Sequence, residues 1–231
     1  MTTTITNCTR LFKFVCNEAA TLRSVYHEFV PVVAFVRGGN VVAMAGVPQG
    51  DLSSTLMAAT MGQLGFDADA IMAVHPGFVT ASPTNPLTGR EWTPDEMHDV
   101  YVNDGGLGGL VSEAAVGVYV TRDGRCEAIK QTVTCGRDKR MVWGEAEVVI
   151  DGDDDHVDGV LPHTLRAIMR DPMALPGADD INRHIEEACE ELGTCHSDDE
   201  TMYNRDLATS AMMLIARCVP LWNDGKPYFK L

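Results

Sequence analysis

The sequence is poor in basic residues, in aromatic residues and in long hydrophobic runs. Its 231 residues include 33 acidic but only 18 basic side chains, which gives a formal net charge of −15 at pH 7. Nucleic-acid binding needs a basic stripe that neutralises phosphates, and no part of the chain supplies one, so we expect no nucleic-acid partner. The longest apolar stretches, 31–36 and 211–216, are far shorter than the ~20 residues that cross a bilayer, which predicts no membrane partner.

Export signals and a disulfide framework are also missing. Residues 1–7 are rich in threonine and lack the basic region and apolar run of a signal peptide. The cysteines number seven, and an odd, scattered set is typical of reduced thiols rather than of paired half-cystines. With 45% hydrophobic and 22% charged residues, the composition is that of a globular protein, which we expect to be cytoplasmic with every cysteine a free thiol.

The hydrophobic pattern predicts an α+β fold in which a largely antiparallel sheet packs with helices, followed by an α-helical C-terminal region. A hairpin over 32–36 and 41–47 is indicated by the glycine turn between its strands, and a three-stranded meander is indicated over 115–122, 125–135 and 141–150. A buried strand is expected over 69–75, before a turn at Pro76–Gly77 and a polar loop. The helices that we expect are 17–29 with Asn17 as N-cap, 53–64 with Gly65 at the C-terminus, a short helix after a capping box at Thr93 and Glu96, 161–170, 181–192 and 198–218.

Composition changes after residue 150, where 151–158 holds five aspartates and the remainder is helical in pattern. We place a boundary there, between an α/β core domain, 1–158, and a helical C-terminal region, 159–231, packed on the core. The helix 198–218 carries a broad apolar stripe that either the core or a second copy of the chain must cover. A homodimer through this helix is therefore one expectation, and packing within the chain is the other.

Local signatures of the common enzyme classes are absent. The sequence contains no phosphate-binding loop of the Gly-x-x-x-x-Gly-Lys type, no Gly-x-Ser-x-Gly elbow and no His-Glu-x-x-His pair. Two imidazoles and two thiols do occur close together, as His184, Cys189, Cys195 and His196, but their spacing does not fit known zinc patterns. We expect no metal and no cofactor, and these residues, with His75, are the metal-ligand candidates that the sequence offers.

The strand that ends at His75-Pro76, followed by a polar loop with Ser82, resembles the JAMM metalloprotease fold. In that family a hairpin and a helix precede a strand that ends in His-x-His-Pro, and a serine and an aspartate follow. The first histidine position is Ala73 here, so His75 is the one ligand that the sequence retains. The resemblance implies, as the alternative reading of function, a metal-dependent hydrolase with its site near His75.

Residues 84–92, 94–97 and 157–169 together resemble uncharacterised proteins of actinobacterial phages and their hosts. That resemblance implies a phage or actinobacterial accessory protein and brings no activity with it. Our leading hypothesis is a non-enzymatic protein that acts by binding another protein. The loop 82–92 is the expected contact, because Asn85, Arg90 and Trp92 are residue types enriched where partners dock. The alternative for Trp92 is a hydrophobic staple that packs onto the following helix.

Overall fold

The computed structural model describes residues 7–26, 29–48, 50–135, 141–150, 160–174, 183, 209 and 218–220. The fold is α+β, as predicted: one seven-stranded sheet in the order β6-β5-β4-β3-β1-β2-β7, with every pairing antiparallel. The strands are β1 (Val32–Arg37), β2 (Asn40–Gly46), β3 (Ala70–Thr80), β4 (Val111–Thr121), β5 (Cys126–Cys135), β6 (Met141–Ile150) and β7 (Val219–Pro220). The helices are α1 (Asn7–Tyr26), α2 (Leu52–Phe66), α3 (Pro94–Asp104) and α4 (Val160–Arg170), with short 3₁₀ turns η1 (Leu107–Gly109) and η2 (Pro172–Ala174).

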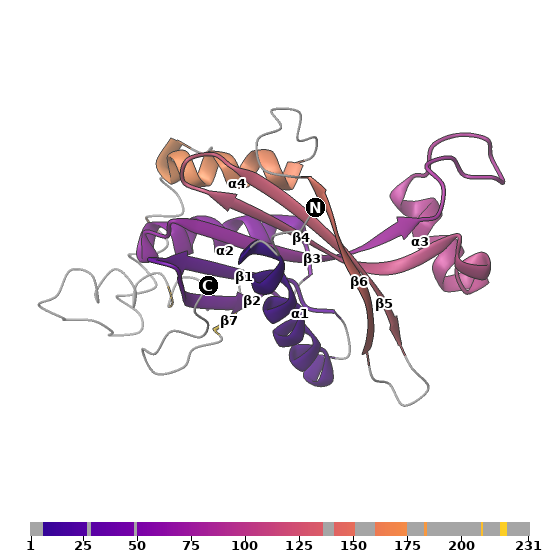
Figure 1. Cartoon of the computed structure of the whole chain (residues 1–231), viewed down its shortest axis with the longest axis horizontal. Helices are drawn as coiled ribbons and strands as arrows, with labels where there is room; N and C mark the ends of the chain where they lie inside the picture. Colours follow the sequence, from indigo (N-terminus) through magenta and orange to yellow (C-terminus); the bar gives the residue numbers. More distant parts are fainter. Residues whose placement is uncertain are drawn as a thin grey trace, which may run out of the picture.

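Helices cover both faces of the central strands, so β1 and β3 are apolar on both sides (Figure 1). On one face α2 and α4 bury a cluster that includes Phe35, Phe66 and Ile168. On the other face α1 buries a second cluster, which includes Phe12 and Met72. The core therefore has two layers, one on each side of the sheet.

The predicted hairpin is confirmed. β1 and β2 pair through a two-residue turn in which Gly38 and Gly39 have φ of 56° and 72°, values that residues with a Cβ rarely adopt. The predicted capping box is confirmed as well: Thr93 Oγ1 accepts from Glu96 N at 3.2 Å, and Glu96 Oε2 accepts from Thr93 N at 3.1 Å. The three-stranded meander and the helix predicted over 161–170 are also present.

The prediction for the first helix was wrong at its start. The helix begins at Asn7, ten residues before the expected N-cap, because Cys8, Leu11 and Val15 continue the buried stripe toward the N-terminus. Asn17 lies on the exposed side of α1, where its carbonyl accepts a hydrogen bond from Thr21 Oγ1 at 3.1 Å. The prediction for the C-terminal end of α2 was also wrong. The residue in the left-handed conformation there is Asp67 (φ 46°), and Gly65, which was expected at that place, lies within the helix.

The strand expected to stop at His75 continues to Thr80 in unbroken register with β4, from Ala70↔Thr121 to Thr80↔Val111. The expected turn at Pro76–Gly77 is therefore wrong. β1 pairs with β3 only as far as Val74, so beyond that residue one edge of β3 has no strand beside it in the described sheet. A proline, which has no N–H to donate, is tolerated at such an edge.

The chain returns to the sheet near its C-terminus, where β7 pairs with the end of β2 and Cys218 lies in the same cluster as α2 and α4. The expected helices 181–192 and 198–218 lie outside the described residues except at isolated positions. The metal-ligand candidates His184, Cys189, Cys195 and His196 also lie outside the described residues. Within the described part of the chain, no helix has both the length and the apolar character needed to cross a membrane.

Candidate functional site

β3 and β4 extend past the neighbouring strands as a two-stranded arm. β1 stops opposite Val74, and β5 pairs with β4 only from Ala114 onward, whereas β3 and β4 remain paired as far as Thr80 and Val111. Residues 81–110, which connect the two strands, form a small unit built on α3 and η1. Figure 1 shows this unit, called here the distal lobe, projecting away from the helices that cover the sheet.

Asn85 organises the loop of the distal lobe from within. Its side chain is buried, with 2% of the residue exposed, and Oδ1 accepts from Leu87 N at 2.9 Å. Its backbone N–H donates to Arg90 O at 2.7 Å, and its carbonyl accepts from Gly89 N at 2.8 Å. This is an Asx-type turn, so the Asn85 amide shapes the loop and presents little surface to a partner.

Trp92 closes the same loop and also borders a groove. The indole Nε1 donates to Ser82 O at 3.0 Å, and Thr84 and Glu91 form a β-bridge beside it. Trp92 directly precedes the N-cap of α3, and Met97 occupies the fourth position of the helix, the pair of positions that forms a hydrophobic staple. Trp92 and Met97 also both line a groove at the base of the distal lobe. The half-buried indole can therefore stabilise the loop and contact a partner at the same time.

Arg90 is exposed at the tip of the loop, consistent with a contact residue. Its charge has a local electrostatic effect on α3. The pKa of Glu96 is held below its usual value, chiefly by the hydrogen bond from the Thr93 backbone and also by the nearby Arg90 guanidinium.

The groove at the base of the distal lobe has a volume of about 470 Å³ and a lining of mixed polar and apolar character. Phe78, Val79 and Thr80 come from the arm, and Pro83, Trp92 and Met97 from the lobe. Two charged residues border it: Glu91, and Lys130 of β5, whose ammonium lies 3.1 Å from Glu147 Oε2. Phe78 is fixed by ring contacts to Tyr101 and His98 of α3, at centroid distances of 5.2 and 6.0 Å.

The distal lobe exposes apolar side chains and carries negative charge. Leu87 is 68% exposed and Val102 60% exposed, although both belong to the residue types that are most often buried. Within 81–110 the acidic residues number five and Arg90 is the single basic residue. The lobe therefore carries a net negative charge, and the groove at its base has an apolar part formed by Phe78, Trp92 and Met97.

His75 does not stand free at the end of a strand. Its Nε2 lies 2.8 Å from Thr55 Oγ1 of α2, and Thr55 Oγ1 is 3.0 Å from Asp51 O. A metal ion could bind Nε2 only by displacing the Thr55 hydroxyl from it. Burial lowers the pKa of His75, and the Asp51 carboxylate partly offsets that effect.

No group of three or more His, Cys, Asp or Glu side chains is arranged to hold a metal ion among the residues that the structure describes. The cysteines whose side chains are described, Cys8, Cys16, Cys126 and Cys218, are buried free thiols. Burial raises the pKa of each of them, so they are protonated and are poor nucleophiles at neutral pH.

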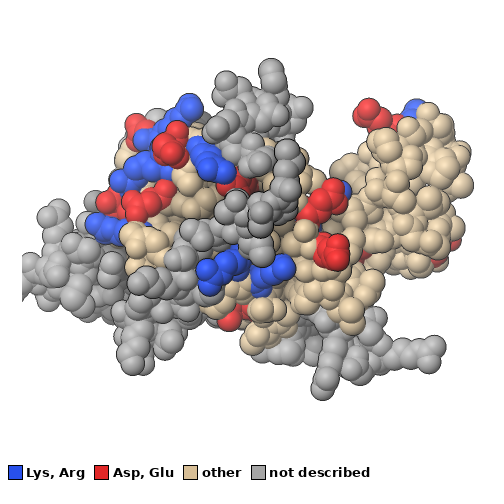
Figure 2. Space-filling view, in the orientation of Figure 1, with Lys and Arg blue, Asp and Glu red and all other residues tan. Residues whose placement is uncertain are grey.

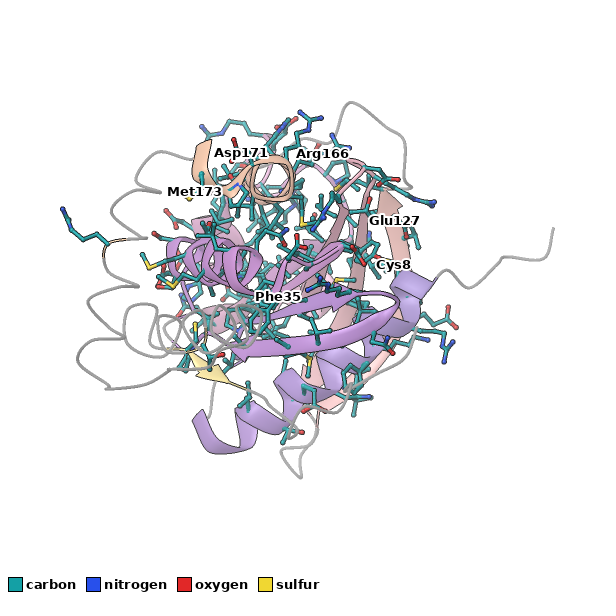
Figure 3. The ribbon with its side chains drawn as sticks, turned by 90° about the vertical axis from the view of Figure 1, so that its left-hand side faces the viewer. Cys8, Phe35, Glu127, Arg166, Asp171 and Met173 are labelled. Carbon is teal, nitrogen blue, oxygen red and sulfur yellow. The ribbon has the colours of Figure 1, made fainter. Side chains whose placement is uncertain are left out.

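A buried acidic side chain that the sequence did not reveal lies beneath the start of α1. Glu127 of β5 is 4% exposed, and its Oε1 pairs with Arg125 Nη2 at 2.9 Å. Figure 3 shows Cys8 of α1 beside Glu127. This carboxylate is one reason that the pKa of Cys8 is raised, after burial itself.

Sequence reasoning located the loop of the distal lobe but missed half of the groove. Phe78 and Val79 fall in the segment that was expected to be a loop, and Lys130 lies on a different strand. A usable signal was present in the run Phe78-Val79-Thr80, whose β-branched and aromatic residues favour a strand.

The chain was also compared with known proteins. No protein-family model, no curated protein and no solved structure matches it.

Proposed function

We propose that this protein is a non-enzymatic, cytoplasmic accessory protein that binds another protein through the groove of the distal lobe. The partner segment that fits is a basic peptide with one or more apolar anchor residues. The observation that carries the proposal is that a projecting arm combines a groove with an apolar part and a lobe with a net negative charge. An origin in an actinobacterial phage or its host, implied by the sequence resemblance, belongs to the same proposal.

The apolar part of the groove accounts for the anchor. Trp92, Met97 and Phe78 line part of a groove whose volume, about 470 Å³, is enough for a leucine-sized or aromatic side chain. Burying one such side chain contributes about 1.5–3 kcal/mol. Aromatic residues and methionine are also the types enriched at the centres of protein interfaces.

The charge of the distal lobe accounts for the basic flanks. The acidic residues of 81–110, five in number, outnumber Arg90, and the whole chain carries a net charge of −15. A field of one sign steers oppositely charged partners and repels others of the same sign. A segment rich in Lys and Arg therefore meets both requirements of the surface.

The test uses labelled synthetic peptides with a central leucine or aromatic anchor, flanked in one series by Lys and Arg and in the other by Asp and Glu. Fluorescence anisotropy with the full-length protein should show binding of the basic series, weakening as salt is raised, and none of the acidic series. Equal binding of both series, or binding of neither, would overturn the proposal.

A matched pair of variants tests whether the peptides bind in the groove. Met97→Lys puts a positive charge in the groove and should abolish binding of the basic peptides. Met173→Lys makes the same change at a residue that is 40% exposed, lies beside α4 (Figure 3) and is not part of the groove lining, and it should leave binding unchanged. Equal effects of the two substitutions would show that the groove is not the contact.

A further inference from the structure

A second pocket lies at the end of the sheet away from the distal lobe, between the C-terminal ends of α2 and α4 and the turn that joins β4 to β5. Its volume is about 590 Å³. Leu64, Met169 and Pro172 supply apolar walls, and Gln63, Arg122 and Arg170 supply polar groups. Figure 3 views the molecule from this end, with α4 seen end-on above α2 and Asp171 and Met173 beside its last turn.

Gln63 contributes a buried acceptor that nothing in the described structure uses. The residue is 6% exposed, and its Nε2 donates to Ala68 O at 3.2 Å. That bond fixes the orientation of the amide, because a carbonyl can only accept. Oε1 is then left buried without a hydrogen-bond partner among the described residues, and an orphaned buried acceptor is unfavourable. A ligand with an N–H donor would satisfy it.

Arg122 is held rigidly at the wall of the pocket. Its Nη2 donates to Ala68 O at 2.8 Å and to Asp67 Oδ1, and Asp67 also lies 3.7 Å from Arg37 Nη2. These contacts hold Asp67 in its left-handed conformation, with φ of 46°. Because the contacts described for Arg122 all use Nη2, the remaining edge of its guanidinium is positioned to bind an anion.

Arg170, the last residue of α4, adds a second guanidinium. Its Nη2 lies over the β4–β5 turn, 3.9 Å from the place that a Cβ on Gly124 would occupy. The lining holds two arginines, Arg122 and Arg170, and one acidic residue, Asp67, which also lies near Arg37. Figure 2 shows basic side chains, with acidic ones between them, gathered over the α4 end of a molecule that is acidic as a whole.

We propose that this pocket binds a nucleoside monophosphate. The phosphate would lie between the guanidinium groups of Arg122 and Arg170, and the planar base would pack on Leu64, Met169 and Pro172. An amine or ring N–H of the base would donate to Gln63 Oε1. This assignment is independent of the distal lobe and of the peptide that the lobe is proposed to bind.

Isothermal titration calorimetry of the full-length protein with each common nucleoside monophosphate tests the assignment, with inorganic phosphate and the parent nucleosides as partial ligands. At least one nucleotide should bind more tightly than inorganic phosphate and than its own nucleoside. Absence of binding by every nucleotide, or equal affinity for nucleotide and inorganic phosphate, would overturn it.

Two variants assign the binding groups, each checked for an intact unfolding transition before titration. Arg170→Gln removes one exposed guanidinium and should weaken nucleotide binding by about tenfold or more, while Arg90→Gln on the distal lobe should have no effect. Gln63→Met removes the acceptor at similar volume and should weaken nucleotide binding but not the binding of inorganic phosphate. Unchanged affinity in Arg170→Gln, or equal losses for nucleotide and phosphate in Gln63→Met, would contradict the proposed pose.

Discussion

Replacing Gly62 by alanine tests how closely α2 approaches the sheet. An alanine Cβ at this position would lie 2.0 Å from Cζ and 2.3 Å from Cε1 of Phe35. Phe35 has no room to retreat, because it is 0% exposed and packs against the ring of Phe66 at a centroid distance of 5.5 Å. Either the ring or the helix must move.

The magnitudes decide the sign of the effect. Alanine is favoured over glycine in a helix interior by about 1 kcal/mol, which alone would stabilise the protein. Overpacking a close-packed core costs about 1–3 kcal/mol, and a separation of 2.0 Å falls at the severe end of that range. The net expectation is a loss of about 2 kcal/mol in the free energy of unfolding, or about 4–8 °C in Tm for a chain of this size.

Thermal and urea unfolding measure the change, with Ser53→Ala on the exposed side of the same helix as the control for helix propensity. A double variant with Phe35→Leu should lose less stability than the sum of the two single variants, because the smaller side chain makes room for the methyl group. An unchanged or raised Tm in Gly62→Ala, or strict additivity in the double variant, would refute the close approach.

Burial lowers the pKa of His75 in the folded protein, so its contribution to stability is complete above the unfolded value of 6.5 and is lost as pH falls from there toward the lower folded pKa. His75→Gln should flatten the dependence of Tm on pH in that window, and an identical profile would contradict it. A thiol titration of the denatured, unreduced protein should find all seven cysteines, and any missing pair would reveal a disulfide. Light scattering on the full chain should report a dimer if the helix predicted over 198–218 makes a two-fold contact, and a monomeric mass would refute that hypothesis.

Features that depend on neighbouring residues in the chain could be predicted from the sequence. The glycine turn of the β1–β2 hairpin and the capping box of α3 each lie within a few residues, and both have a backbone requirement that few sequences meet. The meander β4–β6 was predicted because the hydrophobic pattern of its strands and the turn residues between them indicate the same structure. These elements fixed the fold class before any tertiary contact was known.

The errors arose where tertiary contacts override local signals. Pro76 reads as a strand terminator, but a proline is tolerated where β3 has lost β1 from one of its edges, beyond Val74. Gly65 reads as the end of α2, but the helix continues because Phe66 is buried beneath it and Asp67, paired with Arg122 and Arg37, takes the left-handed conformation. No local pattern predicts those two arginines.

The two candidate sites differ in how far the sequence could predict them, because one comes mostly from one stretch of the chain and the other is assembled only by folding. The loop of the distal lobe is contiguous, so Trp92 and Arg90 could be singled out from the sequence alone. The pocket beside α4 joins Gln63, Arg122 and Arg170, which come from separate elements and meet only in the folded chain. Asn85 is the instructive intermediate case, because its residue type suits both a partner contact and the Asx-type turn that it makes.

The distal lobe should be removable without loss of the fold. Thr80 and Val111 are directly paired at the end of the arm, so a two-residue Asn-Gly turn can join them in place of residues 81–110. Neither core cluster contains a residue of that segment, and Val100 is its one buried hydrophobic side chain. The shortened protein should unfold cooperatively, should no longer bind the basic peptides and should still bind a nucleoside monophosphate. Failure to fold would contradict this description of the core, and retained peptide binding would place the peptide contact elsewhere.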